Sequence, residues 1–220
     1  MHATLRVALE DAVREDLLPR TVAKLVRLSS PTRQEMPILT AEEGRLLLRE
    51  TREDRLFTAL VLLVVLGLRR SEALGLRWSD VDLDAGVLHV RQGLHWSQDG
   101  LMFLPPKSRR SRRTVPLPQL CRNALLAHRE RQVKEGGGLP APLAACRAGL
   151  HHGGRDAGGP NNFSHQFHRW CAGAEVPRVR LHALRHTCVS LLLTLGVRPR
   201  VVMEIVGHAA LERLDGLLDQ

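Results

Sequence analysis

Apolar residues recur at helical spacing over most of the chain, so the sequence predicts a mainly helical protein. Thr40, followed three residues later by Glu43, has the pattern of a capping box that begins a helix. Residues 54–66 are apolar on most sides, which predicts a buried helix that ends at Gly67. The same spacing predicts further helices at 5–28 (one or two short ones), 70–76, 118–135, 163–174, 182–195, 199–207 and 209–218.

The helix expected at 182–195 has the clearest apolar stripe, and Gly196 suits the position after its end. His182 and Arg185 are three residues apart and are expected to share a face that is turned away from the stripe. The stripe consists of Leu181, Leu184, Cys188, Leu191, Leu192 and Leu195.

Three short segments interrupt the helical pattern in the middle of the chain. Residues 87–90 alternate like a strand, and residues 101–104 and 113–117 resemble two more. The basic stretch between the last two is expected to be a turn, and the Gly-rich residues 136–160 a loose surface excursion. The expected fold class is therefore mainly α with a small antiparallel β-sheet (α+β).

Composition and charge favour a nucleic-acid partner. The 220 residues include 32 Lys and Arg against 23 Asp and Glu, and most of the excess is arginine, which grips phosphate with paired donors. The longest apolar run, 59–68, is too short to cross a bilayer, and the N-terminus does not have the pattern of a signal peptide. The four cysteines are scattered, which is typical of reduced thiols. We expect a soluble cytoplasmic protein with no membrane partner, associated with the nucleoid if it binds DNA.

Three separated motifs carry the candidate chemistry. They are Gly67-Leu68-Arg69-Arg70-Ser71-Glu72-Ala73-Leu74; then Pro106-Lys107-Ser108-Arg109 leading into Arg113-Thr114-Val115-Pro116-Leu117; and finally His182-Ala183-Leu184-Arg185-His186-Thr187 with Gly207-His208. In this order and spacing the chain resembles the tyrosine recombinase (phage-integrase) family. The resemblance covers residues 40–220 and implies that family's catalytic domain.

The resemblance also implies roles for individual residues. Arg69 and Arg185 would hold the scissile phosphate, with His182 and His208 adding hydrogen bonds or proton handling. Lys107 would protonate the leaving 5′ oxygen, and Glu72 would brace the arginines. Preorganised donors of this kind stabilise the charge that develops on phosphate oxygens during strand transfer. The basic residues expected to contact double-stranded DNA are Arg70, Arg109, Arg110, Arg112 and Arg113.

Simpler interpretations of the same residues stay open. Glu72 could be only a capping carboxylate, His208 only a helix-end residue, and Lys107 one more charge in a basic turn. His182 and His186 have a spacing that can hold zinc, but no third ligand stands at a suitable distance in the sequence. No metal and no cofactor are expected.

The sequence contains no tyrosine. In the family that the chain resembles, the nucleophilic tyrosine follows the Gly-His pair by nine or ten residues, where Leu217 and Leu218 stand here. The expected organisation is a remnant of a core-binding helical domain at 1–30, a linker at 31–39, and a catalytic domain at 40–220 truncated at its C-terminus.

Three hypotheses follow from this pattern. The first is a DNA-binding protein of the site-specific recombinase type that does not cleave, because covalent catalysis fails without its nucleophile. The second is a strand transferase whose tyrosine comes in trans from a full-length recombinase in a homo- or hetero-oligomer. The third is a non-functional remnant of an integrase gene.

Overall fold

The computed structural model describes residues 2–24, 26, 37–97, 100–106, 111–135 and 160–207. The chain divides into two compact units, Met1–Glu35 and Met36–Gln220. The first unit contains helix α1 (His2–Arg14) and a short 3-10 turn, Val22–Lys24, where the sequence predicted one or two short helices. No helix in the described part of the chain is long and apolar enough to cross a membrane.

The second unit is mainly helical, as the sequence predicted. The capping box is present: the Thr40 hydroxyl accepts from the backbone N–H of Glu43 at 3.2 Å, and the Glu43 carboxylate accepts from the N–H of Thr40 at 2.7 Å. The helix expected at 209–218 lies outside the described residues, and so do residues 107–110 of the expected basic turn. The helices are α2 (Ala41–Glu50), α3 (Phe57–Leu66), α4 (Arg70–Leu74), α5 (Gln119–Lys134), α7 (Pro160–Gly173), α8 (Ala183–Thr194) and α9 (Pro199–Val206).

Within the described residues, the strands form two small antiparallel sheets rather than the single sheet that was expected. Strands β1 (Val81–Asp82), β2 (Val87–Val90) and β5 (Arg113–Pro116) form one sheet in the order β1-β2-β5, and His89 lies opposite Thr114. Strands β3 (Gly93–Ser97) and β4 (Gly100–Leu104) form a separate hairpin. Neither β1 nor β3 was predicted, because β1 has only two residues and β3 begins at a glycine.

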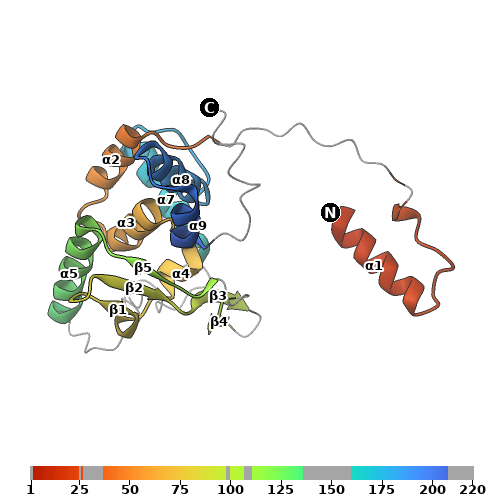
Figure 1. Ribbon diagram of the computed structural model, residues 1–220. Coiled ribbons are helices and arrows are strands. Elements are labelled where there is room, and N and C mark those ends of the chain that lie inside the picture. Colours follow the sequence, from red (N-terminus) through yellow and green to blue (C-terminus); the bar gives the residue numbers. More distant parts are fainter. Residues whose placement is uncertain are drawn as a thin grey trace. The chain divides into compact units, whose positions relative to one another are not determined.

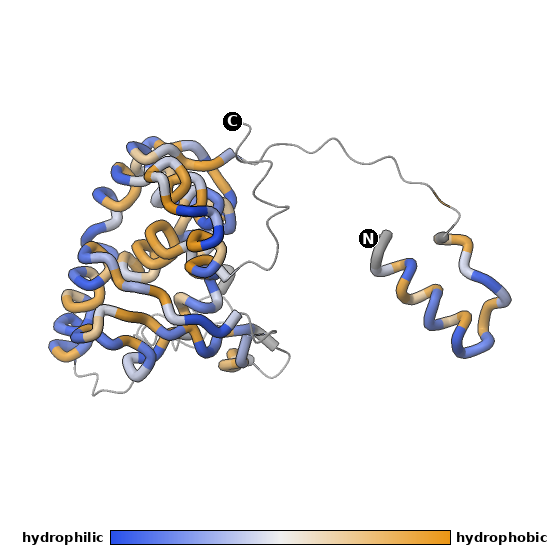
Figure 2. The backbone as a smooth tube through the Cα atoms, viewed as in Figure 1, coloured by the Kyte–Doolittle hydropathy of each residue, from blue (hydrophilic) through white to orange (hydrophobic). Residues whose placement is uncertain are grey.

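Helix α3 is the centre of the second unit. It contacts α5 on one side and α8 on the other, while α2 also contacts α7 (Figure 1). Its sequence is apolar along its whole length, and Figure 2 shows it as a continuous hydrophobic segment among helices of mixed hydropathy. Leu60, Val61 and Leu62 are fully buried, so all faces of the helix contribute to the core. Because only three residues separate the end of α3 from the start of α4, this buried helix fixes the position of Arg69.

The apolar stripe expected on the helix at 182–195 is only partly correct. Leu184 and Cys188 are buried, but Leu195 is 77% exposed, because α8 ends at Thr194 and the chain turns away there. The expected orientation of Arg185 away from the apolar face is also wrong, since its side chain is inserted into the protein with 3% exposure. Contacts with α3 and α9 therefore decide which side of α8 is buried.

Gly67 ends α3 in a left-handed conformation with φ of 57°. A Cβ atom at this position would lie 3.0 Å from Val206 Cγ1 and 3.2 Å from Cys188 Sγ, closer than ordinary van der Waals contact, so side chains of α8 and α9 would have to shift. We expect Gly67→Ala to lower the free energy of unfolding by about 2–3 kcal/mol, through conformational strain and overpacking together. Chemical denaturation followed by circular dichroism measures this loss.

Gly86→Ala is the matched control for this prediction. Gly86 also has a positive φ, of 65°, but no atom lies within 4 Å of the added Cβ. We expect this variant to lose only about 1 kcal/mol, from the left-handed backbone alone. Equal losses in the two variants would show that close contact with α8 and α9 contributes nothing at Gly67.

Candidate functional site

Glu72 lies at the centre of a cluster of charged side chains. Its carboxylate accepts a hydrogen bond from Arg69 Nη1 at 2.6 Å and two from Arg113, at 3.2 and 2.9 Å. It also accepts from the backbone N–H of Arg69 at 2.9 Å, so it caps the start of α4 as well as holding the guanidinium groups. Both expectations for Glu72, the brace and the cap, therefore describe contacts that it makes.

The charge state of Glu72 follows from these partners. Its side chain is only 6% exposed, and burial by itself disfavours the charged carboxylate. The hydrogen bonds and the positive charge of Arg113, with the hydrogen bonds from Arg69, outweigh burial and hold the pKa of Glu72 below its usual range. Glu72 is therefore a carboxylate at neutral pH, and it fixes two arginines side by side.

Arg113 connects three elements of the fold. Besides its contacts with Glu72 of α4, its Nε donates to the backbone carbonyl of Ile205, near the end of α9, at 2.7 Å. Its side chain is 7% exposed. These contacts are all within the protein, so Arg113 braces the cluster; its direct contact with DNA stays a prediction. Strand β5 thereby holds the start of α4 and the end of α9 together.

The buried side chain of Arg185 connects the end of α3 to the end of α9. Its Nη1 donates to the carbonyl of Gly67 at 2.5 Å, and its Nη2 donates to the carbonyl of Val206. Burial, together with the positive charge of Arg69, lowers the pKa of Arg185 to about 10, so the guanidinium remains charged at neutral pH. The contact of Arg185 with a phosphate stays a prediction, because its guanidinium lies between two helix ends.

His182 stands at the surface, directly before α8. Its ring meets that of His186 edge to face, with centroids 5.5 Å apart. Partial burial, followed by the neighbouring His186, Arg185 and Arg69, lowers the pKa of His182 below its usual range. His182 is therefore neutral at pH 7 and has one nitrogen to donate and one to accept.

The other expected site residues are distributed differently. Arg70 is half-buried and donates to the Ser164 hydroxyl at 2.9 Å, so it is not a freely solvated side chain. Arg112 is exposed. Lys107, Arg109, Arg110, His208, Leu217 and Leu218 lie outside the described residues.

The cluster carries more positive than negative charge. Arg69, Arg113 and Arg185 supply three positive charges against the one negative charge of Glu72. The charges of Arg69, Glu72 and Arg113 all influence the pKa of Arg185. Holding like charges together in a partly buried place is unfavourable unless an anion offsets them. Arg69 of the cluster is partly exposed, and the neighbouring His182 is exposed, so an anion would reach the cluster through these two side chains.

Anion binding at the cluster is expected to raise the pKa of His182. A phosphate beside the imidazole favours the imidazolium form, which opposes the present effect of the arginines. We expect the pKa to rise in inorganic phosphate relative to potassium chloride of equal ionic strength, measured from imidazole resonances by NMR. His182→Gln assigns the resonance. An unchanged pKa in phosphate would argue against an anion site next to this ring.

Sequence reasoning missed the bracing contacts of Arg113. The signal was present, because Arg113 and the apolar Val115 lie two residues apart on a strand and so share a face, whereas Arg112 and Thr114 face the other way. The structure confirms this alternation, with Val115 fully buried and Thr114 exposed. The partners themselves, 41 and 92 residues away, leave no local trace in the sequence.

Known proteins are similar to this chain in sequence. The "Integrase" of Saccharopolyspora erythraea is 24% identical over 96% of this chain and 60% of its own length. The "Tyrosine recombinase XerA" of Thermococcus kodakarensis is 31% identical over 79% of this chain and 54% of its own length. The chain thus spans little more than half of the length of these relatives.

Solved structures agree on the fold. The Tn1549 transposon integrase, solved in complex with a circular intermediate DNA, has a TM-score of 0.70 at 19% identity, over 98% of this chain and 72% of that one. The XerA recombinase has a TM-score of 0.64 at 22% identity, over 89% and 65%. The model of the phage integrase family matches residues 37–215, which contain the whole charged cluster. The chain belongs to the phage integrase family, the tyrosine recombinases.

Proposed function

We propose that this chain binds duplex DNA in site-specific recombination or integration, and that it does so without cutting the strand. The observation that carries the proposal is the buried carboxylate of Glu72, which holds Arg69 and Arg113 at hydrogen-bond distance beside Arg185. The exposed side chains of Arg69 and His182 would hold one backbone phosphate, while the buried Arg185 adds positive charge nearby.

The relatives support DNA as the partner. The Tn1549 integrase was solved with a circular intermediate DNA, and λ integrase was solved as a dimer on a core site and as a tetramer on a Holliday junction. Phosphate contacts provide most of the affinity of such proteins, and guanidinium groups provide them with fixed geometry. The excess of nine positive charges over the whole chain acts in the same direction.

The absence of tyrosine from the sequence supports binding without cleavage. The residues at the positions implied for the nucleophile, Leu217 and Leu218, have no group that can attack phosphorus. An activated phosphate is not cleaved covalently without a nucleophile, however well its oxygens are stabilised, because these residues act as a unit. We therefore infer a domain that engages the DNA backbone but forms no covalent adduct by itself.

Arg69→Gln tests the binding part of the proposal. Removing one charged hydrogen-bond donor from a phosphate costs about 1.5–3 kcal/mol, so we expect the affinity for a 30-base-pair duplex to fall roughly 10- to 100-fold. Fluorescence anisotropy at several salt concentrations measures the affinity and its salt dependence. Arg45→Gln is the control, since Arg45 lies on α2 and pairs with the exposed Glu42. Equal binding by the wild-type protein and both variants would refute the proposed phosphate site.

A suicide substrate, which traps a covalent adduct, tests the cleavage part. The wild-type chain is expected to give no adduct, whereas Leu218→Tyr or Leu217→Tyr restores the missing phenol. An adduct with either variant would show that the phosphate-activating residues are in place and that the nucleophile alone is lacking. An adduct with the wild-type chain would overturn the proposal that this chain does not cleave.

A further inference from the structure

A second buried carboxylate holds a second pair of arginines, on another part of the fold. Asp80, at the end of the 3-10 turn Trp78–Asp80, is 1% exposed. Its carboxylate accepts from Arg77 at 2.8 and 3.2 Å and from Arg91, which follows β2, at 3.4 Å. This repeats the arrangement at Glu72, where one buried carboxylate also holds two guanidinium groups. Each carboxylate neutralises one of its two arginines, so one positive charge is left over.

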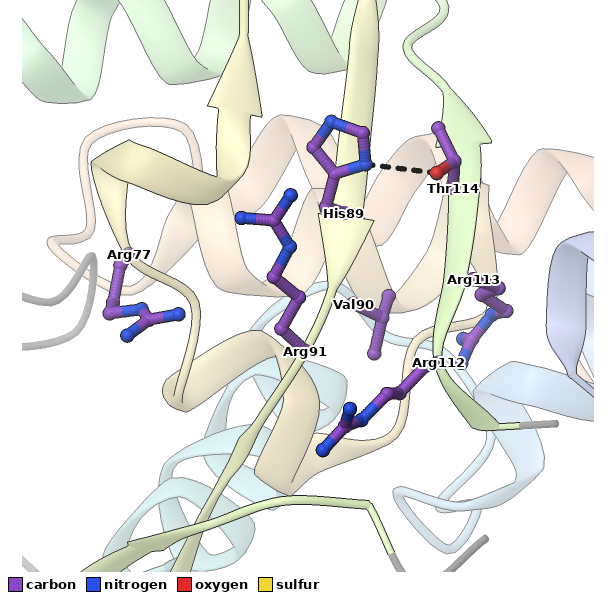
Figure 3. Close-up of a pocket in the computed structure, with 7 residues that line it drawn as sticks. All are labelled: Arg77, His89, Val90, Arg91, Arg112, Arg113 and Thr114. Atoms are coloured by element: carbon purple, nitrogen blue, oxygen red, sulfur yellow. Dashed lines mark hydrogen bonds between the residues drawn. The ribbon is translucent and has the colours of Figure 1, made fainter. Parts of the chain in front are cut away.

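These arginines line a pocket of about 620 Å³ on the three-stranded sheet. Figure 3 shows Arg112 and Arg113 projecting to opposite sides of β5, with Arg112 on the same side as Arg77 and Arg91. Next to these arginines, a 2.9 Å hydrogen bond between the side chains of His89 and Thr114 connects β2 to β5. Arg113 also lines the pocket, but its guanidinium pairs with Glu72 and so belongs to the first cluster.

The charge of the pocket points to an anion. Arg77, Arg91 and Arg112 bring three positive charges against the one negative charge of Asp80, which leaves an excess of two. The Arg91 side chain is 54% exposed and Arg112 is exposed as well, so both can reach a ligand from solvent. Each guanidinium presents paired donors that match the oxygens of a phosphate.

The lining favours a backbone phosphate over a free nucleotide. The lining has no Phe, Tyr or Trp on which a base could stack, and the edge of its one aromatic ring, His89, is bonded to Thr114. The remaining lining offers charge and hydroxyl groups, which suit phosphate and sugar contacts. Arg112 and Arg113 are adjacent in the chain, so strand β5 joins the two sites directly.

We propose that the pocket formed by Arg77, Arg91 and Arg112 binds a second phosphate of the same DNA duplex that the Glu72 cluster engages. This inference rests on the proposed function, since it assigns a further part of the same DNA interface. The exposed side of the sheet is then a binding surface. Arg112, directly before β5, would contact the second phosphate, while Arg113 at the start of β5 braces the Glu72 cluster.

The double variant Arg91→Gln, Arg112→Gln tests the second site in the full chain. Losing one phosphate contact lowers the slope of log affinity against log salt by about 0.9, which corresponds to about eightfold weaker binding at 0.1 M salt. The probe is a 30-base-pair duplex, and Arg45→Gln is again the control. Both changes are at exposed positions, and Arg77 still pairs with Asp80 in the variant, so the fold should persist; a thermal melt checks this. Arg112→Gln alone serves if the double variant melts early.

Combination with Arg69→Gln separates the two sites. Independent phosphates predict that the losses in log affinity add in the triple variant. If the triple variant instead bound DNA as tightly as whichever of Arg69→Gln and the double variant binds more weakly, both sites would contact one phosphate. That result would overturn a second site. Unchanged binding by the double variant, with weakened binding by Arg69→Gln, would refute this inference alone. Unchanged binding by both would refute the proposed function as well.

Discussion

Replacing Glu72 by glutamine is expected to lower the free energy of unfolding by about 3–5 kcal/mol at pH 7, because it removes one partner from a buried ion pair. Arg113 would keep its charge at a place where its side chain is only 7% exposed. The repulsion among Arg69, Arg113 and Arg185 would then no longer be offset by the negative charge of Glu72. For a unit of this size we expect the melting temperature to fall by about 6–20 °C.

The effect of Glu72→Gln should depend on pH in a defined direction. The pKa of Glu72 is lowered in the folded protein, so its carboxylate stabilises the fold above the unfolded-state pKa, near 4.5. That stabilisation is lost as the pH falls through the lower, folded-state pKa. The difference between wild-type and variant proteins should therefore be full at pH 7 and shrink below pH 4.5.

Denaturant titrations at several pH values measure this difference. Glu42→Gln is the control: Glu42 pairs with Arg45 at 3.3 Å, but both side chains are well exposed. Such surface pairs contribute about 0–1 kcal/mol, so the control should stay close to wild type. A similar small loss for Glu72→Gln would mean that the arginines do not depend on this carboxylate.

The parts of the fold that the sequence predicted are those with local signals. The capping box at Thr40 and the left-handed glycines Gly67 and Gly207, which end α3 and α9, depend on residues within one or two turns. The family resemblance placed Arg69, Glu72 and Arg185 in one site, and the structure brings these three together. Local chemistry and residue order were sufficient for this much.

The parts that the sequence did not predict depend on distant partners. The hairpin of β3 and β4 pairs within itself, whereas the expected single sheet would have joined 101–104 to its neighbours. Helical spacing placed Arg185 on a polar face, but carbonyl groups at the ends of α3 and α9 provide acceptors that make its burial favourable. Such acceptors appear only when the helices are assembled, so no periodicity in α8 could reveal them.

Replacing Arg185 by methionine is expected to destabilise the fold by about 2–5 kcal/mol, since two buried carbonyl acceptors lose their donor at about 1–3 kcal/mol each. Relief of repulsion from Arg69 and of the desolvation that lowers the Arg185 pKa offsets a part of this loss. Arg185→Lys keeps the charge but not the fork of donors, so one ammonium group is expected to recover only part of the stability.

The position of the predicted loss is as informative as its size. Arg185 joins the carbonyl of Val206 to that of Gly67, so without it the end of α9 should open more often. In Arg185→Met, hydrogen exchange should therefore accelerate more for the amides of 199–207 than for those of α5. Arg200→Lys is the matched control on the same helix, because the Arg200 side chain is 92% exposed. If exchange in α9 stayed unchanged in Arg185→Met, this guanidinium would not be what holds the end of α9 in place.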